Sequence, residues 1–278
     1  MSQPGIRRRS TQPTTNAHRF VWATVVVAVA LGGCSLLDEE RESSQTVGAD
    51  GTPTTSRLGS EQDAESARTA LLTLSDFGPG WSEVPVGSDD PFEDLGEERD
   101  RRLSECTGSA DSGSLMAASI GSAKAATGTF TSPDTDSTVE QSVGLAPDVA
   151  SAAAGMTALE DPNLPACLQG TFLWFIQTVI DDPPDPSDTL PPGASIGDVT
   201  VARLNVAQAG DQLVAFRTTI PIQISGLTVT QYFDLVFVRS GRAVSQLQFG
   251  SVFKPFEVPV LDWTTAIAAN RLAVVGVQ

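Results

Sequence analysis

Four runs of alternating apolar and polar residues dominate the last third of the chain. They cover residues 199–201, 214–222, 227–237 and 243–249, and alternation with period two is typical of half-buried strands. Short turn-forming segments, Ala209-Gly210-Asp211, Ser225-Gly226 and Ser240-Gly241, separate the runs. Connections this short favour antiparallel neighbours. The pattern therefore predicts a four-stranded antiparallel meander.

Apolar residues at helical spacing predict four further elements. The first helix begins at Ser60 and ends at Gly78-Pro79-Gly80, and the second begins at Pro147 and ends near Asp161. The third segment follows Cys167, although residues 172–180 alone could also form a buried strand. The fourth begins at Pro259 and ends at Gly276, which suits a left-handed cap. The spaced apolar residues are, in this order, Ala64, Ala67, Leu71 and Leu74; Val149, Ala153, Met156 and Leu159; Leu168, Phe172, Phe175, Ile176 and Val179; and Leu261, Ala268, Leu272 and Val275.

The sequence thus predicts an α+β fold. Its antiparallel sheet contains the C-terminal meander, and a hairpin of residues 125–130 and 139–145 could add N-terminal strands across the polar turn at 132–137. The helices are expected to pack on one face of this sheet. A loop over residues 181–192, rich in proline and aspartate, separates the helical middle of the chain from the meander.

The N-terminus has the pattern of an export signal. Residues 1–19 carry four arginines and no acid, and the apolar run 20–31 is too short to cross a bilayer. The run ends in Leu31-Gly32-Gly33-Cys34, which resembles the bacterial lipobox. That resemblance implies a lipoprotein signal peptide of residues 1–33 and a Cys34 that carries diacylglyceryl, with fatty acids such as palmitate. An ordinary cleaved signal followed by a chance cysteine is the alternative.

Composition supports a tether and one domain after this signal. The formal net charge is −17; removing residues 1–33 removes four of the 17 basic residues and none of the 34 acids, which leaves 13 − 34 = −21. Nucleic acid is therefore not an expected partner. Residues 34–60, with the acylated cysteine, contain few apolar side chains and are expected to be a disordered tether. Residues 61–278 are enough for a single extracytoplasmic domain.

Two cysteines remain after Cys34 receives the lipid. Cys106 and Cys167 are an even pair in an exported chain, so we expect a disulfide. It would close a loop of about 60 residues and stabilise the fold by about 4 kcal/mol on the chain-entropy model. A zinc site is the alternative, but two thiolates do not complete a tetrahedral shell and no histidine remains to help.

The residues offer little support for catalysis. The single histidine, His18, lies in the signal, so serine and cysteine triads and histidine-based metal sites are excluded. Gly193-Ala194-Ser195-Ile196-Gly197 matches the hydrolase elbow pattern, but a proline-rich loop precedes it and a strand follows. A hydrolase that uses a pair of carboxylates remains an alternative, because 34 acids offer many pairs and none stands out. We therefore expect no enzyme, no metal and no cofactor.

Several features together resemble actinobacterial cell-envelope lipoproteins. They are the lipobox, the acidic Ser/Thr-rich tether, the segment Ala70-Leu71-Leu72-Thr73-Leu74-Ser75-Asp76-Phe77-Gly78-Pro79-Gly80-Trp81, and the spaced pair Cys106 and Cys167. More loosely, the chain is similar to the sensor-type extracellular domains of mycobacterial receptor kinases. The resemblance implies an α+β domain with helices against an antiparallel sheet. The chain departs from those kinase domains, which commonly have two disulfides, because it has only one pair.

The functional expectation is a non-catalytic binding or sensor-like lipoprotein on the outer face of the cytoplasmic membrane. Its partners would be the membrane, through Cys34, and an unknown small ligand or envelope protein. An envelope scaffold that docks a membrane or secretion complex is the alternative. Five aromatic residues between the third helical segment and the sheet could line an apolar cleft, or they could all belong to the core: Phe172, Trp174, Phe175, Phe233 and Phe237.

Overall fold

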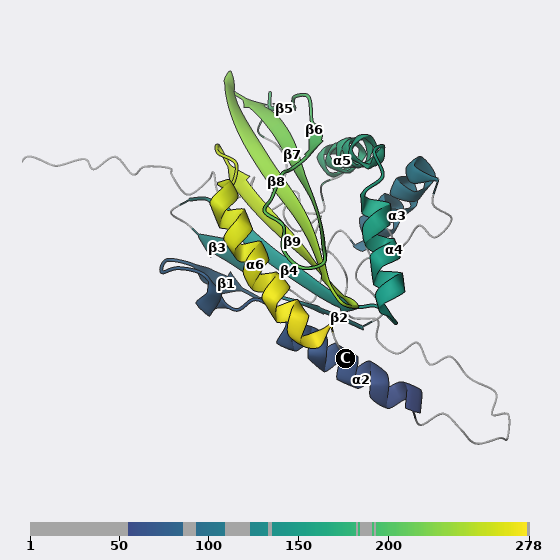
Figure 1. The fold of residues 1–278 in the computed structure, drawn as a ribbon. Coiled ribbons are helices and arrows are strands. Elements are labelled where there is room, and N and C mark those ends of the chain that lie inside the picture. Colours follow the sequence, from purple (N-terminus) through teal and green to yellow (C-terminus); the bar gives the residue numbers. More distant parts are fainter. Residues whose placement is uncertain are drawn as a thin grey trace, which may run out of the picture.

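The computed structural model describes residues 55–85, 93–108, 123–132, 135–181, 183, 191 and 193–276. Its described strands form one sheet in which every neighbouring pair is antiparallel, in the order β1-β3-β4-β9-β8-β7-β5 (Figure 1). β2 also pairs with β4, and β6 pairs with β7. The strands are β1 Ser82–Val84, β2 Ala123–Ala126, β3 Thr129–Ser132, β4 Ser137–Leu145, β5 Ser195–Ile196, β6 Thr200–Arg203, β7 Gln212–Ile224, β8 Leu227–Ser240 and β9 Ala243–Val252.

The described helices cover both faces of this sheet. α6 crosses one face with α2 beside its C-terminal end, while α4 and α5 cover the opposite face and α3 lies against α5 (Figure 1). We call these two sides the α6 face and the α5 face. The helices are α2 Thr55–Thr69, the 3-10 turn η2 Leu74–Asp76, α3 Glu93–Thr107, α4 Val149–Leu159, α5 Leu164–Asp181 and α6 Val258–Val275.

The α+β class and the C-terminal meander are confirmed. Strands β6 to β9 follow one another as antiparallel neighbours, with Phe216 opposite Leu235 and Leu235 opposite Gln248. The β7–β8 turn has positive φ at both Ser225 (52°) and Gly226 (83°). Type I′ hairpin turns require this conformation, because their twist matches that of the strands.

The expected N-terminal hairpin is also present and joins the same sheet. β3 pairs with β4, with Phe130 opposite Val139. β4 then pairs along its whole length with β9, from Ser137 opposite Ser251 to Leu145 opposite Ala243. The N-terminal and C-terminal strands therefore share one core-forming sheet.

The helices do not lie on one face only, in contrast to the expectation. The reason is the composition of β7 and β8, where successive residues alternate between two cores. Phe216 and Leu235 belong to the core under α4 and α5, whereas Ala215 and Val236 belong to the core under α6. A strand that is apolar on both sides requires cover on both faces of the sheet.

Several helix boundaries differ from the expected ones. α2 begins at Thr55 rather than Ser60, so its first turns lie in the segment assigned to the tether. It also ends at Thr69 rather than at Gly78-Pro79-Gly80, and Leu74 lies in the separate turn η2. α4 begins after Asp148, whose side chain accepts a hydrogen bond of 2.7 Å from the Ser151 N–H. The segment that could have been a strand is α5. Gly276 is not left-handed, with φ −77°.

One helix, α3, was not expected at all. Its sequence is rich in Arg and Glu, and it buries Leu103 with Leu95 half-buried beside the same core. Residues 1–54 lie outside the described part of the chain. The signal peptide, the lipid on Cys34 and most of the tether therefore stay predictions.

Candidate functional site

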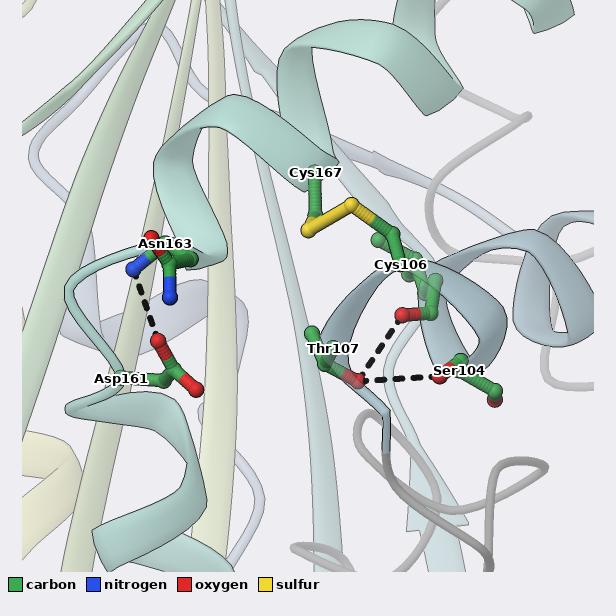
Figure 2. Close-up of a disulfide and its surroundings, with 7 residues drawn as sticks. Ser104, Cys106, Thr107, Asp161, Asn163 and Cys167 are labelled. Atoms are coloured by element: carbon green, nitrogen blue, oxygen red, sulfur yellow. Dashed lines mark hydrogen bonds between the residues drawn. A yellow bond between two sulfur atoms is a disulfide. The ribbon is translucent and has the colours of Figure 1, made fainter.

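Cys106 and Cys167 form the expected disulfide. Their sulfur atoms lie 2.02 Å apart and their Cα atoms 5.7 Å apart, and the bond joins the C-terminal end of α3 to the first turns of α5 (Figure 2). A second contact lies further along the two helices, where the guanidinium of Arg102 lies 4.5 Å from the centre of the Trp174 ring. Such cation–π contacts are favourable by about 0.5–1 kcal/mol at partly exposed sites. The disulfide and this contact together hold α3 on α5.

The five aromatic residues proposed for an apolar cleft lie in or beside the core of the α5 face. Phe172 and Phe175 on α5, and Phe233 and Phe237 on β8, are each at most 4% exposed. Trp174 is half-buried at the edge of that core, beneath Arg102. This placement fits the alternative in which the four phenylalanines are core residues.

A polar patch lies on the same face of the sheet, on β3, β4 and β9. The cross-strand pairs define it, because directly opposed residues point to the same side of a sheet. Gln248 lies opposite both Leu235, a core residue of the α5 face, and Glu140; Gln246 lies opposite both Phe237 and Ser142. We define the polar patch as Thr129, Thr138, Glu140, Ser142, Gln246 and Gln248.

The carboxyl group of Glu140 is at the centre of the polar patch. The Thr129 hydroxyl donates a hydrogen bond of 2.6 Å to Glu140 Oε1. Burial raises the pKa of Glu140 above its usual range, and the hydrogen bond from Thr129 opposes that shift. Gln246 and Gln248 beside it are 6% and 4% exposed, whereas Glu140 itself is only half-buried. The patch therefore has a buried amide side on β9 and a more open side on β3 and β4.

Gly250 extends the patch on β9. It lies opposite both Thr138 and Phe233, and a Cβ at this position would lie less than 3.0 Å from the Thr138 hydroxyl oxygen. The absence of a side chain here lets the threonine hydroxyl lie flat against β9. The patch thus combines hydroxyl, amide and carboxyl groups directly beside the phenylalanines of β8.

The chemistry of the polar patch suits binding better than proton transfer. Amides and hydroxyls donate and accept hydrogen bonds but do not titrate near neutral pH. Glu140 is its one titratable group, and the patch as defined contains no second carboxylate. Sequence reasoning missed this patch because polar residues that alternate with apolar ones were read as the solvent side of half-buried strands. In the structure, α4 and α5 cover this face of the sheet, so it is not simply the solvent side.

On the opposite face, three arginine–aspartate pairs join different elements of the fold. Arg217 on β7 donates two hydrogen bonds, of 2.6 and 2.7 Å, to Asp234 on β8, and a third, of 3.2 Å, to the carbonyl of Phe256. Burial raises the pKa of Asp234, while the hydrogen bonds from Arg217 oppose the shift. The contact with Phe256 fixes the segment that leads into α6. Because Arg217 and Asp234 use their hydrogen-bonding groups on each other and on the Phe256 carbonyl, we assign this ion pair a structural role.

The other two pairs connect N-terminal elements. Arg242, in the β8–β9 turn, makes a bidentate ion pair with Asp63 on α2 and donates to the carbonyl of Ala146. Arg271 on α6 pairs with Asp76 in η2, with N–O distances of 2.7 and 2.5 Å. Each pair holds an N-terminal segment against the C-terminal half of the fold.

Comparisons with known proteins give little beyond this geometry. No protein-family model and no curated protein matches the chain. Among solved structures, the extracellular domain of PknH from Mycobacterium tuberculosis is similar with a TM-score of 0.38 and 10% sequence identity, over 77% of this chain and 97% of that domain. No described helix is both long and apolar enough to cross a bilayer.

Proposed function

We propose that the protein is a lipid-anchored, extracytoplasmic binding module that captures a polar ligand on the polar patch without catalysing a reaction. The observation that carries this proposal is the row of Glu140, Gln246 and Gln248 on a sheet face where the neighbouring β8 residues Leu235 and Phe237 are apolar. A few polar groups that converge beside apolar walls are typical of small-ligand sites.

The charge and chemistry of the patch favour a particular ligand class. Glu140 disfavours an anionic ligand, and amides and hydroxyls pair well with hydroxyl and amide groups. The phenylalanines of β8 provide an apolar wall for the ligand's carbon skeleton. We therefore propose a neutral or cationic ligand rich in hydroxyl or amide groups, such as a saccharide or a short peptide.

The location follows from different observations. The arginine-rich start, the apolar run 20–31 and the Leu-Gly-Gly-Cys34 sequence support export and lipidation. The disulfide supports an oxidising compartment outside the cytoplasm. Attachment to the outer face of the cytoplasmic membrane fits both.

The second candidate is an envelope scaffold that docks a membrane or secretion complex through protein contacts. Its support is exposed apolar surface on α6, where Trp263 is 50% and Val274 67% exposed. A scaffold would use that surface rather than the polar patch. Variants of the patch would then leave its interactions unchanged.

The test is to identify what the native protein carries. The processed full chain is isolated from its own envelope in mild detergent and examined by native mass spectrometry, beside the double variant Glu140→Gln/Gln248→Leu. We expect a saccharide or peptide on the wild type and its loss from the variant. The matched control is Gln208→Leu, at an exposed position in the segment between β6 and β7. A ligand that is absent from all three proteins, or that is retained by the double variant, contradicts binding at the patch.

A further inference from the structure

The side of α6 that faces solvent is apolar at nearly every exposed position. Its exposed positions contain one polar side chain, Asn270. A surface helix normally places polar residues there, and a helix that is apolar on all sides is normally buried. We call the following exposed residues the apolar stripe: Val258, Val260, Trp263, Ala266, Ala273 and Val274.

The segment before α6 contains a further exposed aromatic residue, Phe253. Phe253 is 62% exposed and has φ +70°, a left-handed conformation that bulky residues avoid. Its backbone N–H donates a hydrogen bond of 2.8 Å to the carbonyl of Thr230, which fixes this conformation. Left-handed backbone costs about 1–2 kcal/mol for a residue with a Cβ. The fold therefore holds an aromatic side chain in solvent at a cost in stability.

We propose that Phe253 and the apolar stripe rest on the surface of the lipid bilayer to which Cys34 anchors the chain. This inference rests on the lipid anchor of the proposed function. Tryptophan prefers the boundary between water and hydrocarbon, because its ring is apolar and its N–H is polar. Trp263 lies on the exposed side of α6, in the first half of the helix. It is the residue of the apolar stripe that would lie at this boundary.

The length of chain before the described structure permits this contact. Twenty residues separate Cys34 from Thr55, and fully extended they reach about 70 Å. α2 and α6 together are about 50 Å long at 1.5 Å per residue. They pack through their C-terminal halves, where Ala67 and Ala70 share a core with Ala269 and Leu272. The anchored chain can therefore place every part of the apolar stripe on the bilayer.

The lipid anchor also explains how a low affinity of the apolar stripe for lipid would be enough for docking. The net charge of 13 − 34 = −21 that remains once residues 1–33 are removed opposes attraction to anionic lipids, so the stripe must act through apolar contact. A short flexible connection provides effective concentrations in the millimolar range. Docking is therefore expected for the anchored chain and absent for the same chain without its lipid.

The experiment uses the full chain, lipidated at Cys34 by its host and reconstituted in phosphatidylcholine vesicles with brominated acyl chains. Brominated lipids quench tryptophans that lie at the bilayer surface. We expect the emission of Trp263, obtained by difference from the Trp263→Phe variant, to lose most of its intensity. Val260→Asp/Val274→Asp should restore that emission. Val149→Asp is the matched control, because Val149 is 52% exposed on α4 at the opposite face.

The outcomes separate the docking from the anchor. Flotation of the same vesicles measures anchoring alone: a chain that does not float contradicts the proposed lipid anchor. A chain that floats while Trp263 stays unquenched overturns the docking and leaves the anchor intact. Equal loss of quenching in the Val149→Asp control also overturns it. A photoreactive group at position 263 that labels a protein instead of lipid in native membranes overturns it in favour of the scaffold.

Discussion

Gly241 and Gly276 meet where the β8–β9 turn reaches the end of α6, and neither position has room for a side chain. A Cβ on Gly241 would lie less than 3.0 Å from the carbonyl oxygen of Gly276, and a Cβ on Gly276 would lie as close to the carbonyl oxygen of Ser240. The Arg242 N–H donates a hydrogen bond of 3.2 Å to that Gly276 oxygen. The turn and the helix end are thus joined directly through their backbones.

Substitution of Gly276 by alanine tests this contact. Its φ of −77° suits any residue, so the expected loss comes from the close approach of a Cβ to the carbonyl groups of Ser240 and Leu272. We expect Gly276→Ala to lower the free energy of unfolding by about 1–3 kcal/mol, in the range of overpacked sites. Gly78→Ala is the control, because nothing lies within 4 Å of a Cβ there. Urea denaturation of both variants provides the measurement, and equal stabilities would contradict the close approach.

The disulfide should make a large contribution to stability. Because 61 residues separate Cys106 from Cys167, replacing both by alanine should cost about 4 kcal/mol on the chain-entropy model. Arg102→Ala removes the contact with Trp174 together with a partly exposed ion pair with Glu98, and should cost about 0.5–1 kcal/mol. Denaturation midpoints with and without reductant distinguish the two. If reduction leaves the midpoint unchanged, the disulfide does not stabilise the fold.

The ion pair between Asp63 and Arg242 should make stability depend on acid pH. The hydrogen bond from Arg242 lowers the pKa of Asp63, so the folded chain holds this proton less tightly than the unfolded chain. The stabilisation is present above about pH 4 and is lost as the pH falls through the lower folded pKa. Asp63→Asn should cost about 1–2 kcal/mol at pH 7 and progressively less below pH 4.

Glu65→Gln on the same helix is the control for that pH dependence. Glu65 pairs with Arg68 at the surface, where its side chain is 71% exposed, and such pairs contribute little. Thermal unfolding from pH 2 to pH 7 compares the three proteins. A difference between wild type and Asp63→Asn that does not shrink in acid would argue against the ion pair.

Glu140 should have the opposite pH dependence. Burial raises its pKa in the folded state, so the folded chain binds this proton more tightly than the unfolded chain. Stability from this group is fully present below about pH 4 and is lost as the pH rises through the folded pKa. Glu140→Gln should therefore be more stable than wild type at pH 7, and the two should converge near pH 4.

Thr129→Val extends the test of Glu140. Loss of the hydroxyl removes the hydrogen bond that favours the charged carboxylate, so the pKa of Glu140 should rise further and stability at pH 7 should fall. Carbon-detected NMR titration of the carboxyl group reads this pKa directly. A normal Glu140 pKa in the wild type would show that the polar patch is open to water.

Local patterns in the sequence account for much of the fold. The period-two runs led to β7, β8 and β9, and the helical spacing that follows Pro259 led to α6, because each pattern is set by residues close together in the chain. α3 was missed because its sequence is dominated by charged residues, and the apolar side chains known to pack in the core are Leu95 and Leu103. Its attachment depends on Cys167 and Trp174, which lie far away in the sequence.

The polar patch could not be predicted from local sequence patterns, for a different reason. Glu140 and Ser142 point to one side of β4, as Gln246 and Gln248 do on β9, and either strand alone looks like half of a solvated sheet. Only the pairing of β4 with β9 brings these residues together beside Phe233. Contacts between strands so distant in sequence are not encoded in either strand alone.

The pairing of β4 with β9 also determines the order in which the chain can fold. Gln141 on β4 donates a hydrogen bond to Ser245 on β9, which lies 104 residues later. In a chain that leaves the ribosome or the membrane N-terminus first, β4 has its β3 neighbour early but waits for β9 while about a hundred further residues emerge. During that interval its open edge can pair with other chains. β9 thus protects a strand made long before it, and truncation before Ala243 would leave an aggregation-prone intermediate.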